Sequence, residues 1–327
     1  MSPKSFRCFS FTASRDWFYR YSFGNAGLRS VATVFGDGTE MHCWVPKSRK
    51  PLKPNLFLVH GFGANAMWQY GEHLKHFISH FNVYVPDLLF FGKSFTTRPE
   101  RTESFQAVCM KKLMDIHGVR RTSMVGISYG GFVAYSVAAQ FPEAVEKLVL
   151  CCAGVCLEEK DMKDGLFNVS SLEEASSILL PQTAEKLKEL MNFSFVRPVR
   201  GVPNWFLSDF IHVMCSDYVT EKRELLETIL KDRKLSNLPK ITQHTLIIWG
   251  EQDKIFPLEL GNRLKRHVGE SAELVTIKNA GHAVNLEKPR EFAKHLKDFL
   301  IDSESPSSSA PSFMDQIQKK FDLSSRK

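Results

Sequence analysis

Short apolar runs alternate with longer stretches of helical periodicity through most of this 327-residue chain, and this alternation constrains its fold more than any other feature. Strands that alternate with helices predict a mainly parallel sheet with helices on both faces, because parallel strands need crossover connections. An antiparallel pair with a turn at Asp37-Gly38 is predicted first, in "RSVATVFGDGTEMHCWV". The predicted strands that follow it are 56–60, 83–87, 123–126, 147–152, 245–250 and 273–279.

One interval interrupts this alternation. Residues 154–240 contain helical patterns, among them "AEKLKELMNF" and "EKRELLETILKDRK", and no convincing strand. Because this length exceeds that of an ordinary connection, we expect a helical cap inserted between two strands. The predicted domains are a core of 29–153 and 241–301, the cap 154–240, a basic aromatic segment 1–28, and a disordered tail 302–327.

The composition is that of an ordinary globular protein, with 43% apolar and 24% charged residues and no apolar stretch long enough to cross a bilayer. The first residues mix arginines and aromatics where a signal peptide needs an apolar core, so we expect a cytoplasmic protein that is not secreted. Seven cysteines without paired spacing fit reduced core residues better than a disulfide framework. We expect no metal site.

The net charge of +7 is concentrated near the start of the chain, where residues 1–53 carry nine Lys or Arg against three Asp or Glu. No nucleic-acid-binding motif accompanies this charge, and we expect no nucleic-acid partner. The aromatics of segment 1–28 are expected to pack on the domain, because exposed aromatic clusters are uncommon. Peripheral contact of this segment with an anionic membrane surface is the alternative. The sequence predicts no particular oligomeric state.

Ser128 lies between Gly126 and Gly130 in "VGISYGGF", directly after a predicted strand and before a helical pattern. Ligands bind at the carboxyl ends of the strands in doubly wound sheets, so reactive groups are expected there. Asp253 and His282 each follow a later predicted strand. A serine hydroxyl needs an imidazole to take its proton, and the imidazole needs an acid to orient it. The ordered set therefore predicts a catalytic triad.

Two backbone N–H groups are the expected donors to an oxyanion: that of Tyr129, directly after the serine, and that of Phe62 in "HGFG". Glu251 stays an alternative to Asp253 as the acid, because spacing does not separate two acids on one loop.

His60 and Asp87 also end predicted strands, and we expect both to have structural roles. His60 is expected to shape the loop that carries Phe62, and Asp87 is expected to stabilise its own loop. The stretch "FFGKS" at 90–94 resembles the end of a phosphate-binding loop, but Asp87 occupies the position that needs the earlier glycine, which argues against a nucleotide site.

Five stretches resemble motifs of the α/β-hydrolase family: "HGFGAN", "VPDLLFFGKS", "VGISYGG", "IIWGEQDKIFP" and "AGHAVNLEKP". Within the family, they are most similar to the monoacylglycerol lipase-like members with a helical cap, particularly those of plants. The resemblance covers about residues 30–301, and its motifs are specific for the family but not for a substrate. It implies an α/β-hydrolase fold with Ser128 as nucleophile, Asp253 as acid, His282 as base, and Phe62 with Tyr129 as oxyanion donors.

We expect a hydrolase of small apolar carboxylic esters, with monoacylglycerol as a candidate substrate, that works through an acyl-enzyme and without a cofactor. One alternative is a carbon–carbon bond hydrolase of the ring-cleavage type, although such enzymes commonly carry asparagine at the position of Ile127. Another is a ligand receptor that keeps this fold. The expected acyl pocket is walled by cap aromatics, namely Phe193, Phe195, Trp205, Phe206 and Phe210.

Overall fold

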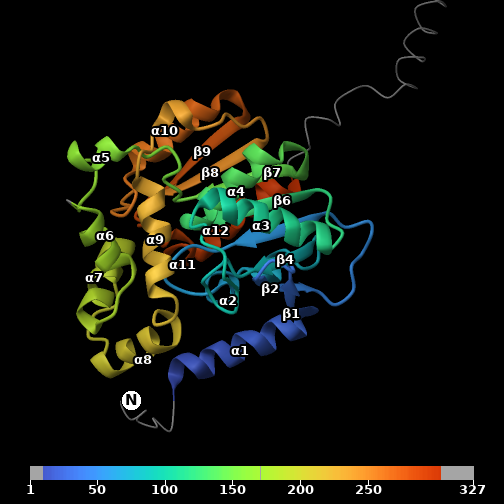
Figure 1. The fold of residues 1–327 in the computed structure, drawn as a ribbon, viewed down its shortest axis with the longest axis horizontal. Coiled ribbons are helices and arrows are strands. Elements are labelled where there is room, and N and C mark those ends of the chain that lie inside the picture. Colours follow the sequence, from blue (N-terminus) through green and yellow to red (C-terminus); the bar gives the residue numbers. More distant parts are fainter. Residues whose placement is uncertain (1–9, 170, 303–327) are drawn as a thin grey trace, which may run out of the picture.

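The structure is a computed structural model that describes residues 10–169 and 171–302. The predicted tail 302–327 therefore lies outside the described residues except for its first residue, and so do residues 1–9 of the N-terminal segment. Figure 1 shows a central sheet with helices on both faces and a further group of helices, including α6, α7 and α8, at one side. Within 10–169 and 171–302, no helix is long and apolar enough to cross a membrane.

The predicted fold class is confirmed. Among the described residues, the sheet has nine strands in the order β1-β2-β4-β3-β6-β7-β8-β9, with β5 paired to β2. The pairs that β1 and β2 make are antiparallel, and the strands from β4 to β9 along this order are parallel. The strands are β1 (Leu28–Val34), β2 (Thr39–Pro46), β3 (Asn55–Val59), β4 (Asn82–Pro86), β5 (Phe95–Thr96), β6 (Thr122–Ile127), β7 (Val145–Cys151), β8 (His244–Gly250) and β9 (Ala272–Ile277).

Two hydrophobic cores form on the two faces of the sheet, because the central strands are buried on both sides and read as nearly continuous apolar runs. One core takes side chains from α3, α4 and α10, and the other from α1, α2 and α12. These helices are α1 (Phe11–Asn25), α2 (Ala66–Tyr70), α3 (Glu103–Ile116), α4 (Tyr129–Gln140), α10 (Leu258–Val268) and α12 (Pro289–Lys297), with α11 (Val284–Glu287) before the last; 3-10 helices span Leu74–His76, Pro142–Ala144, Leu235–Asn237 and Gly269–Ser271, and a π-helix spans Asp298–Asp302.

The chain between β7 and β8, residues 152–243, is called the helical insertion below. Side chains of Ser171 and Thr183 cap two of its helices by accepting from the amides of Glu174 and Lys186. The insertion has a small core of its own around Leu187 and also contributes α9 side chains to the main core. Its helices are α5 (Glu159–Lys163), α6 (Leu172–Leu179), α7 (Ala184–Ser194), α8 (Asn204–Met214) and α9 (Val219–Leu230).

The N-terminal segment folds into α1, and its aromatics divide between two sides of that helix. Tyr19 and Phe23 are buried in the core beneath α1, as expected. Trp17, Phe18 and Tyr21 are exposed, so the expectation that the aromatics pack on the domain was wrong for these three. The physical reason is helical geometry, since only one face of a helix meets the sheet.

The start of α1 is joined to the helical insertion. The carboxylate Oδ2 of Asp209 on α8 accepts from the hydroxyl of Ser10 and from the backbone N–H of Thr12, each at 3.0 Å. The ring of Phe11 lies against Trp205 and Phe206, with centroids 5.6 and 6.1 Å apart. In Figure 1 the α1 helix runs along the bottom of the view with this end beside α8.

Candidate active site

Ser128 occupies a tight turn between β6, which ends at Ile127, and α4, which begins at Tyr129. Its φ of 53° and ψ of −123° are unusual for a residue with a side chain, and such strain persists only where the surroundings fix it. A Cβ on Gly126 would lie 2.4 Å from the carbonyl oxygen of Gly130, so the strand and the helix approach too closely for any larger residue. The turn projects Ser128 beyond the end of the sheet.

His282 lies in the loop after β9 and connects the other two members of the predicted triad. Its Nε2 lies 2.9 Å from the Oγ of Ser128, and its Nδ1 lies 2.8 Å from the Oδ2 of Asp253. Because an ionised carboxylate only accepts hydrogen bonds, Nδ1 carries the proton and Nε2 accepts from the serine hydroxyl. The structure therefore brings the three side chains together in the order Ser, His, Asp.

Asp253 is fixed by its own loop after β8. Its Oδ1 accepts from the backbone N–H groups of Ile255 and Phe256 at 2.8 and 2.9 Å, which leaves Oδ2 directed at the imidazole. Glu251, the alternative acid, is exposed and accepts instead from the N–H of Asn279. The geometry therefore favours Asp253 over Glu251 as the partner of the histidine.

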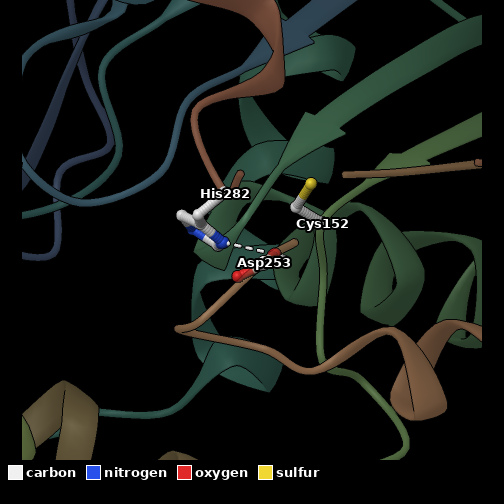
Figure 2. Close-up of side chains that lie close together, drawn as sticks. All are labelled: Cys152, Asp253 and His282. Atoms are coloured by element: carbon white, nitrogen blue, oxygen red, sulfur yellow. Dashed lines mark hydrogen bonds and ion pairs between the residues drawn. The ribbon is translucent and has the colours of Figure 1, made fainter. Parts of the chain in front are cut away.

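Cys152 adjoins this pair, and Figure 2 shows its side chain beside Asp253 and His282. The possible ligand atoms of the three residues lie within 4.8 Å of one another, which raises the question of a metal. Burial, together with the neighbouring Cys151 and Asp253, raises the pKa of the Cys152 thiol well above its usual range, so the thiolate that a metal needs is disfavoured. The oxygens of Asp253 and the nitrogens of His282 already have hydrogen-bond partners. The set fits a hydrogen-bonded triad better than a metal centre.

The two predicted oxyanion donors flank Ser128. Tyr129 is the first residue of α4, and the N–H groups of a first helical turn have no acceptor within the helix. Phe62 belongs to the loop after β3, which passes so close to the serine that a Cβ on Gly61 would lie 2.8 Å from the carbonyl oxygen of Ile127 and 2.9 Å from the Cβ of Ser128. The loop and the start of α4 are thus adjacent at the serine.

Gln69 on α2 holds this loop, a role that the sequence did not indicate. Its Oε1 accepts from the N–H of Gly61 at 2.9 Å, and its Nε2 donates to the carbonyl oxygens of Gly61 and Phe62 at 3.1 and 3.0 Å. His60 adds a second tie, as expected, because its Nε2 accepts from the N–H of Leu88 and its Nδ1 donates to the carbonyl oxygen of Gly61. The loop is therefore positioned before any substrate binds.

Asp87 has different partners from those expected. Its carboxylate makes its hydrogen bonds outside its own loop, since Oδ2 lies 2.8 Å from Nδ1 of His42 on β2 and Oδ1 accepts from the N–H of Ala66 at the start of α2. Within the loop, the carboxylate packs against Gly92, and the backbone carbonyl of Asp87 accepts from the hydroxyl of Ser94. Burial acts to raise the pKa of Asp87, but the hydrogen bond and charge of His42, with His60 and Ala66, outweigh it and hold that pKa below its usual value. Asp87 therefore anchors the element that carries Gln69.

A cavity of about 940 Å³ opens in front of Ser128 and His282. Phe195, Phe206 and Phe210, three of the expected aromatics, line it. Phe193 instead lines a separate cavity of about 70 Å³, and Trp205 is half-exposed and packs on Phe11 and Phe206. The predictions for Phe193 and Trp205 were wrong because each side chain points from its helix toward other surroundings, Phe193 into the smaller cavity and Trp205 toward Phe11 and solvent, and composition alone does not give this direction.

Most of the cavity wall was not anticipated from sequence. One face of α7 contributes aliphatic side chains, and the start of α1 adds a third wall that the sequence did not connect to the site. The spacing of the α7 residues by three and four positions is the signal that identifies such a face. The residues concerned are Leu187, Leu190, Met191 and Ser194 of α7, and Phe11, Thr12 and Arg15 of α1.

Comparison with known proteins identifies the family. The model of the alpha/beta hydrolase fold family matches residues 54–289. The chain belongs to the α/β-hydrolase fold family. Monoacylglycerol lipase ABHD6 of Bos taurus is 27% identical over 79% of this chain and 78% of its own length. A 2-hydroxy-6-oxononadienedioate/2-hydroxy-6-oxononatrienedioate hydrolase of a Pseudomonas species is 26% identical over 75% of this chain and 86% of its own length.

A solved structure agrees with the fold. The crystal structure of a putative lipase from Acinetobacter baumannii superposes with a TM-score of 0.73 at 22% identity, covering 88% of this chain and 95% of that one. Together, the family match and the relatives support a hydrolase of the α/β fold.

Proposed function

We propose that the protein hydrolyses small apolar carboxylic esters, monoacylglycerols among them, through an acyl-enzyme on Ser128. The observation that carries the proposal is the hydrogen-bonded chain from Ser128 through His282 to Asp253, which opens onto a cavity of about 940 Å³. The likeness to a monoacylglycerol lipase supports this choice of substrate class.

In the proposed mechanism, Nε2 of His282 takes the proton of Ser128 as Oγ attacks the ester carbonyl. The N–H groups of Phe62 and Tyr129 stabilise the negative oxygen of the tetrahedral intermediate. The imidazolium then gives its proton to the leaving alcohol, and the acyl group stays on Oγ. A water molecule that His282 deprotonates attacks the acyl-enzyme, and collapse of the second intermediate releases the acid and restores Ser128. Asp253 holds the imidazole and stabilises its charged form.

The shape and lining of the cavity suit an acyl chain. Its wall combines aromatic rings of α8 with aliphatic side chains of α7, and the helical insertion acts as a cap over the triad. The polar lining residues Gln69 and Asn285 are engaged with backbone groups of the protein. Such a wall stabilises an apolar substrate in proportion to the area it buries.

Carbon–carbon bond hydrolysis is the second candidate, because a relative from Pseudomonas carries that activity in its name. The same triad serves both reactions, so the substrate decides between them. The wall is mostly apolar, which favours the ester; Arg15 and Arg200 also line the cavity and are the groups that would pair with the carboxylates of a ring-cleavage product.

The cysteines support a reducing compartment such as the cytosol. The six cysteines among the described residues are all buried and form no disulfides. Secreted domains commonly use cysteines in disulfides, whereas cytosolic proteins keep them reduced.

The function is tested with purified full-length protein on monoacylglycerols and activated esters of graded chain length, beside a 2-hydroxy-6-oxo-dienoate. Ester turnover, an acyl-enzyme seen by intact mass, and fluorophosphonate labelling that Ser128→Ala abolishes would support the proposal. The matched control is Ser136→Ala on α4, which should label normally. Preferred turnover of the dienoate would establish the second candidate instead. Ligand binding without turnover or labelling would overturn both and favour a receptor.

A further inference from the structure

The outer face of α1 carries a band of exposed aromatic rings. Trp17, Phe18 and Tyr21 are 67%, 58% and 58% exposed, and the rings of Trp17 and Tyr21 stack with centroids 5.9 Å apart. Trp17 and Tyr21 lie on the side of the helix opposite the buried Tyr19, and Phe18 and Phe11 lie on the flank between the two sides. A contiguous patch of exposed aromatic rings is unfavourable in water. Such a patch commonly marks a site that binds another apolar surface.

This band is continuous with the mouth of the active-site cavity. Phe11 belongs to both, because it lines the cavity, is half-exposed, and lies against the rings of Trp205 and Phe206. Val199 and Leu286 likewise line the cavity while remaining exposed, which marks where the cavity opens. The opening is thus bordered on several sides by apolar side chains that reach the surface.

Basic residues border part of the opening, beside Glu287, whose carboxylate accepts from the backbone N–H groups of Val196 and Arg197. The connection from α7 to α8, residues 195–203, contains Arg197 and Arg200 and no acidic residue, and Arg200 lines the cavity mouth. Upstream of α1, the sequence 1–9 contains Lys4 and Arg7 and again no acid. Basic residues beside aromatic rings match the interface of an anionic bilayer, where the rings enter the headgroup region and the cations meet the lipid phosphates and carboxylates.

We propose that the aromatic face of α1 and the rim of the cavity dock on an anionic lipid bilayer, with the cavity mouth turned toward the lipid. The docking surface comprises Phe11, Trp17, Phe18, Tyr21, Val199, Trp205, Phe206 and Leu286. In this orientation an amphiphile leaves the bilayer and enters the cavity without crossing water. The bond between Asp209 and the start of α1 holds the band and the rim in one orientation, so both meet the membrane together.

The test is flotation of the full-length protein with vesicles of equal parts phosphatidylcholine and phosphatidylserine, and with vesicles of phosphatidylcholine alone. The test variant is Trp17→Ser/Phe18→Ser/Tyr21→Ser, whose three side chains lie outside the cavity lining. The control variant is Val34→Ser/Leu52→Ser/Ile116→Ser, which removes three exposed apolar side chains at the end of β1, between β2 and β3, and at the end of α3. Hydrolysis of a soluble short-chain ester is measured for each protein.

Docking predicts that the test variant loses vesicle binding by about tenfold or more while the control variant and Ser128→Ala bind like the original chain. Binding to phosphatidylcholine alone should be weaker, and added salt should weaken binding to the anionic vesicles. Unchanged hydrolysis of the soluble ester in the test variant would show that its fold is intact.

Equal vesicle binding by the two triple variants, or none by the original chain, would overturn the proposal. Capture of a protein partner through this face without vesicle binding would overturn it as well. Far-UV circular dichroism and urea unfolding of each variant report on its fold without activity, so failure of the proposed hydrolysis leaves this test unaffected.

Discussion

The side-chain amide of Gln69 donates to the carbonyl oxygen of Phe62 at 3.0 Å, so a residue of α2 sets the position of a proposed oxyanion donor. Replacing it with leucine, which keeps the approximate volume but removes all three bonds to the loop, should displace the N–H of Phe62. We expect kcat for a short ester to fall roughly 10- to 100-fold with KM little changed, because the donor acts mainly in the transition state. Steady-state kinetics beside Gln140→Leu, an exposed glutamine on α4, checks this. A parallel loss in both variants would assign the effect to general destabilisation.

The acid is tested by the pair Asp253→Asn and Glu251→Gln. Asparagine at 253 offers the imidazole a donor or a weak acceptor in place of a carboxylate, so the productive tautomer is lost. We expect turnover to fall by roughly 10⁴, the scale known for the acid of a serine protease, and Glu251→Gln to have a small effect. Measured kcat/KM on one activated ester decides the ranking. The reverse order would transfer the role to Glu251.

The backbone strain at Ser128 predicts that the nucleophile costs stability. At a φ of 53°, glycine has no Cβ to clash, whereas alanine keeps the strain of serine. The free energy of unfolding of Ser128→Gly should therefore exceed that of Ser128→Ala by about 1 kcal/mol. We expect both variants to be inactive. Urea unfolding of the two variants gives the difference. Equal stability would mean that the strain relieved at this φ is no larger than the extra conformational entropy that glycine loses on folding.

The cavity wall predicts the preference for acyl length. Phe210 lines the cavity and packs edge-on against Trp68, so Phe210→Ala enlarges the pocket. Each extra methylene that finds room in it should strengthen transition-state binding by about 0.8 kcal/mol, which shifts the optimum to longer chains. The readout is kcat/KM across a series of soluble esters. Trp205→Ala is the matched control, since that ring lies outside the lining, and an equal shift in both would remove the cavity as the cause.

A buried histidine predicts a loss of stability in acid. Burial lowers the pKa of His73 to about 4, while its ring donates to the carbonyl oxygen of Asn285. Between pH 4 and about 6.5 the unfolded chain binds a proton that the folded chain does not, so the free energy of unfolding falls as pH falls through this window, by up to about 3 kcal/mol. His73→Gln, which keeps a donor but does not titrate, should flatten this dependence. Urea unfolding at pH 7 and pH 5 measures this change in the free energy of unfolding. An equal change in the original protein and in His73→Gln would contradict the role given to His73.

The strands and the hydrogen-bonded cluster of Ser128, His282 and Asp253 could be predicted from the sequence because both follow local rules. Apolar runs of strand length predicted the parallel sheet, and reactive side chains directly after those runs predicted the cluster at Ser128. The bonds of Gln69 were not accessible, since nothing in an isolated glutamine says which backbone groups it meets in space. Trp205 failed for another reason: composition located an aromatic-rich segment, but the direction of each ring depends on helix phase and on the packing of α1 against α8.

The hydrogen bond between His282 and Ser128 spans 154 positions of the chain. This separation has a consequence during synthesis. The ribosome must translate β9 and the loop after it before His282 can meet Ser128. Until then Ser128 stands on a folded or folding sheet as an ordinary hydroxyl. Under the proposed mechanism, Ser128 of a nascent chain therefore lacks the base that activates it until β9 has joined the sheet and His282 lies beside the serine.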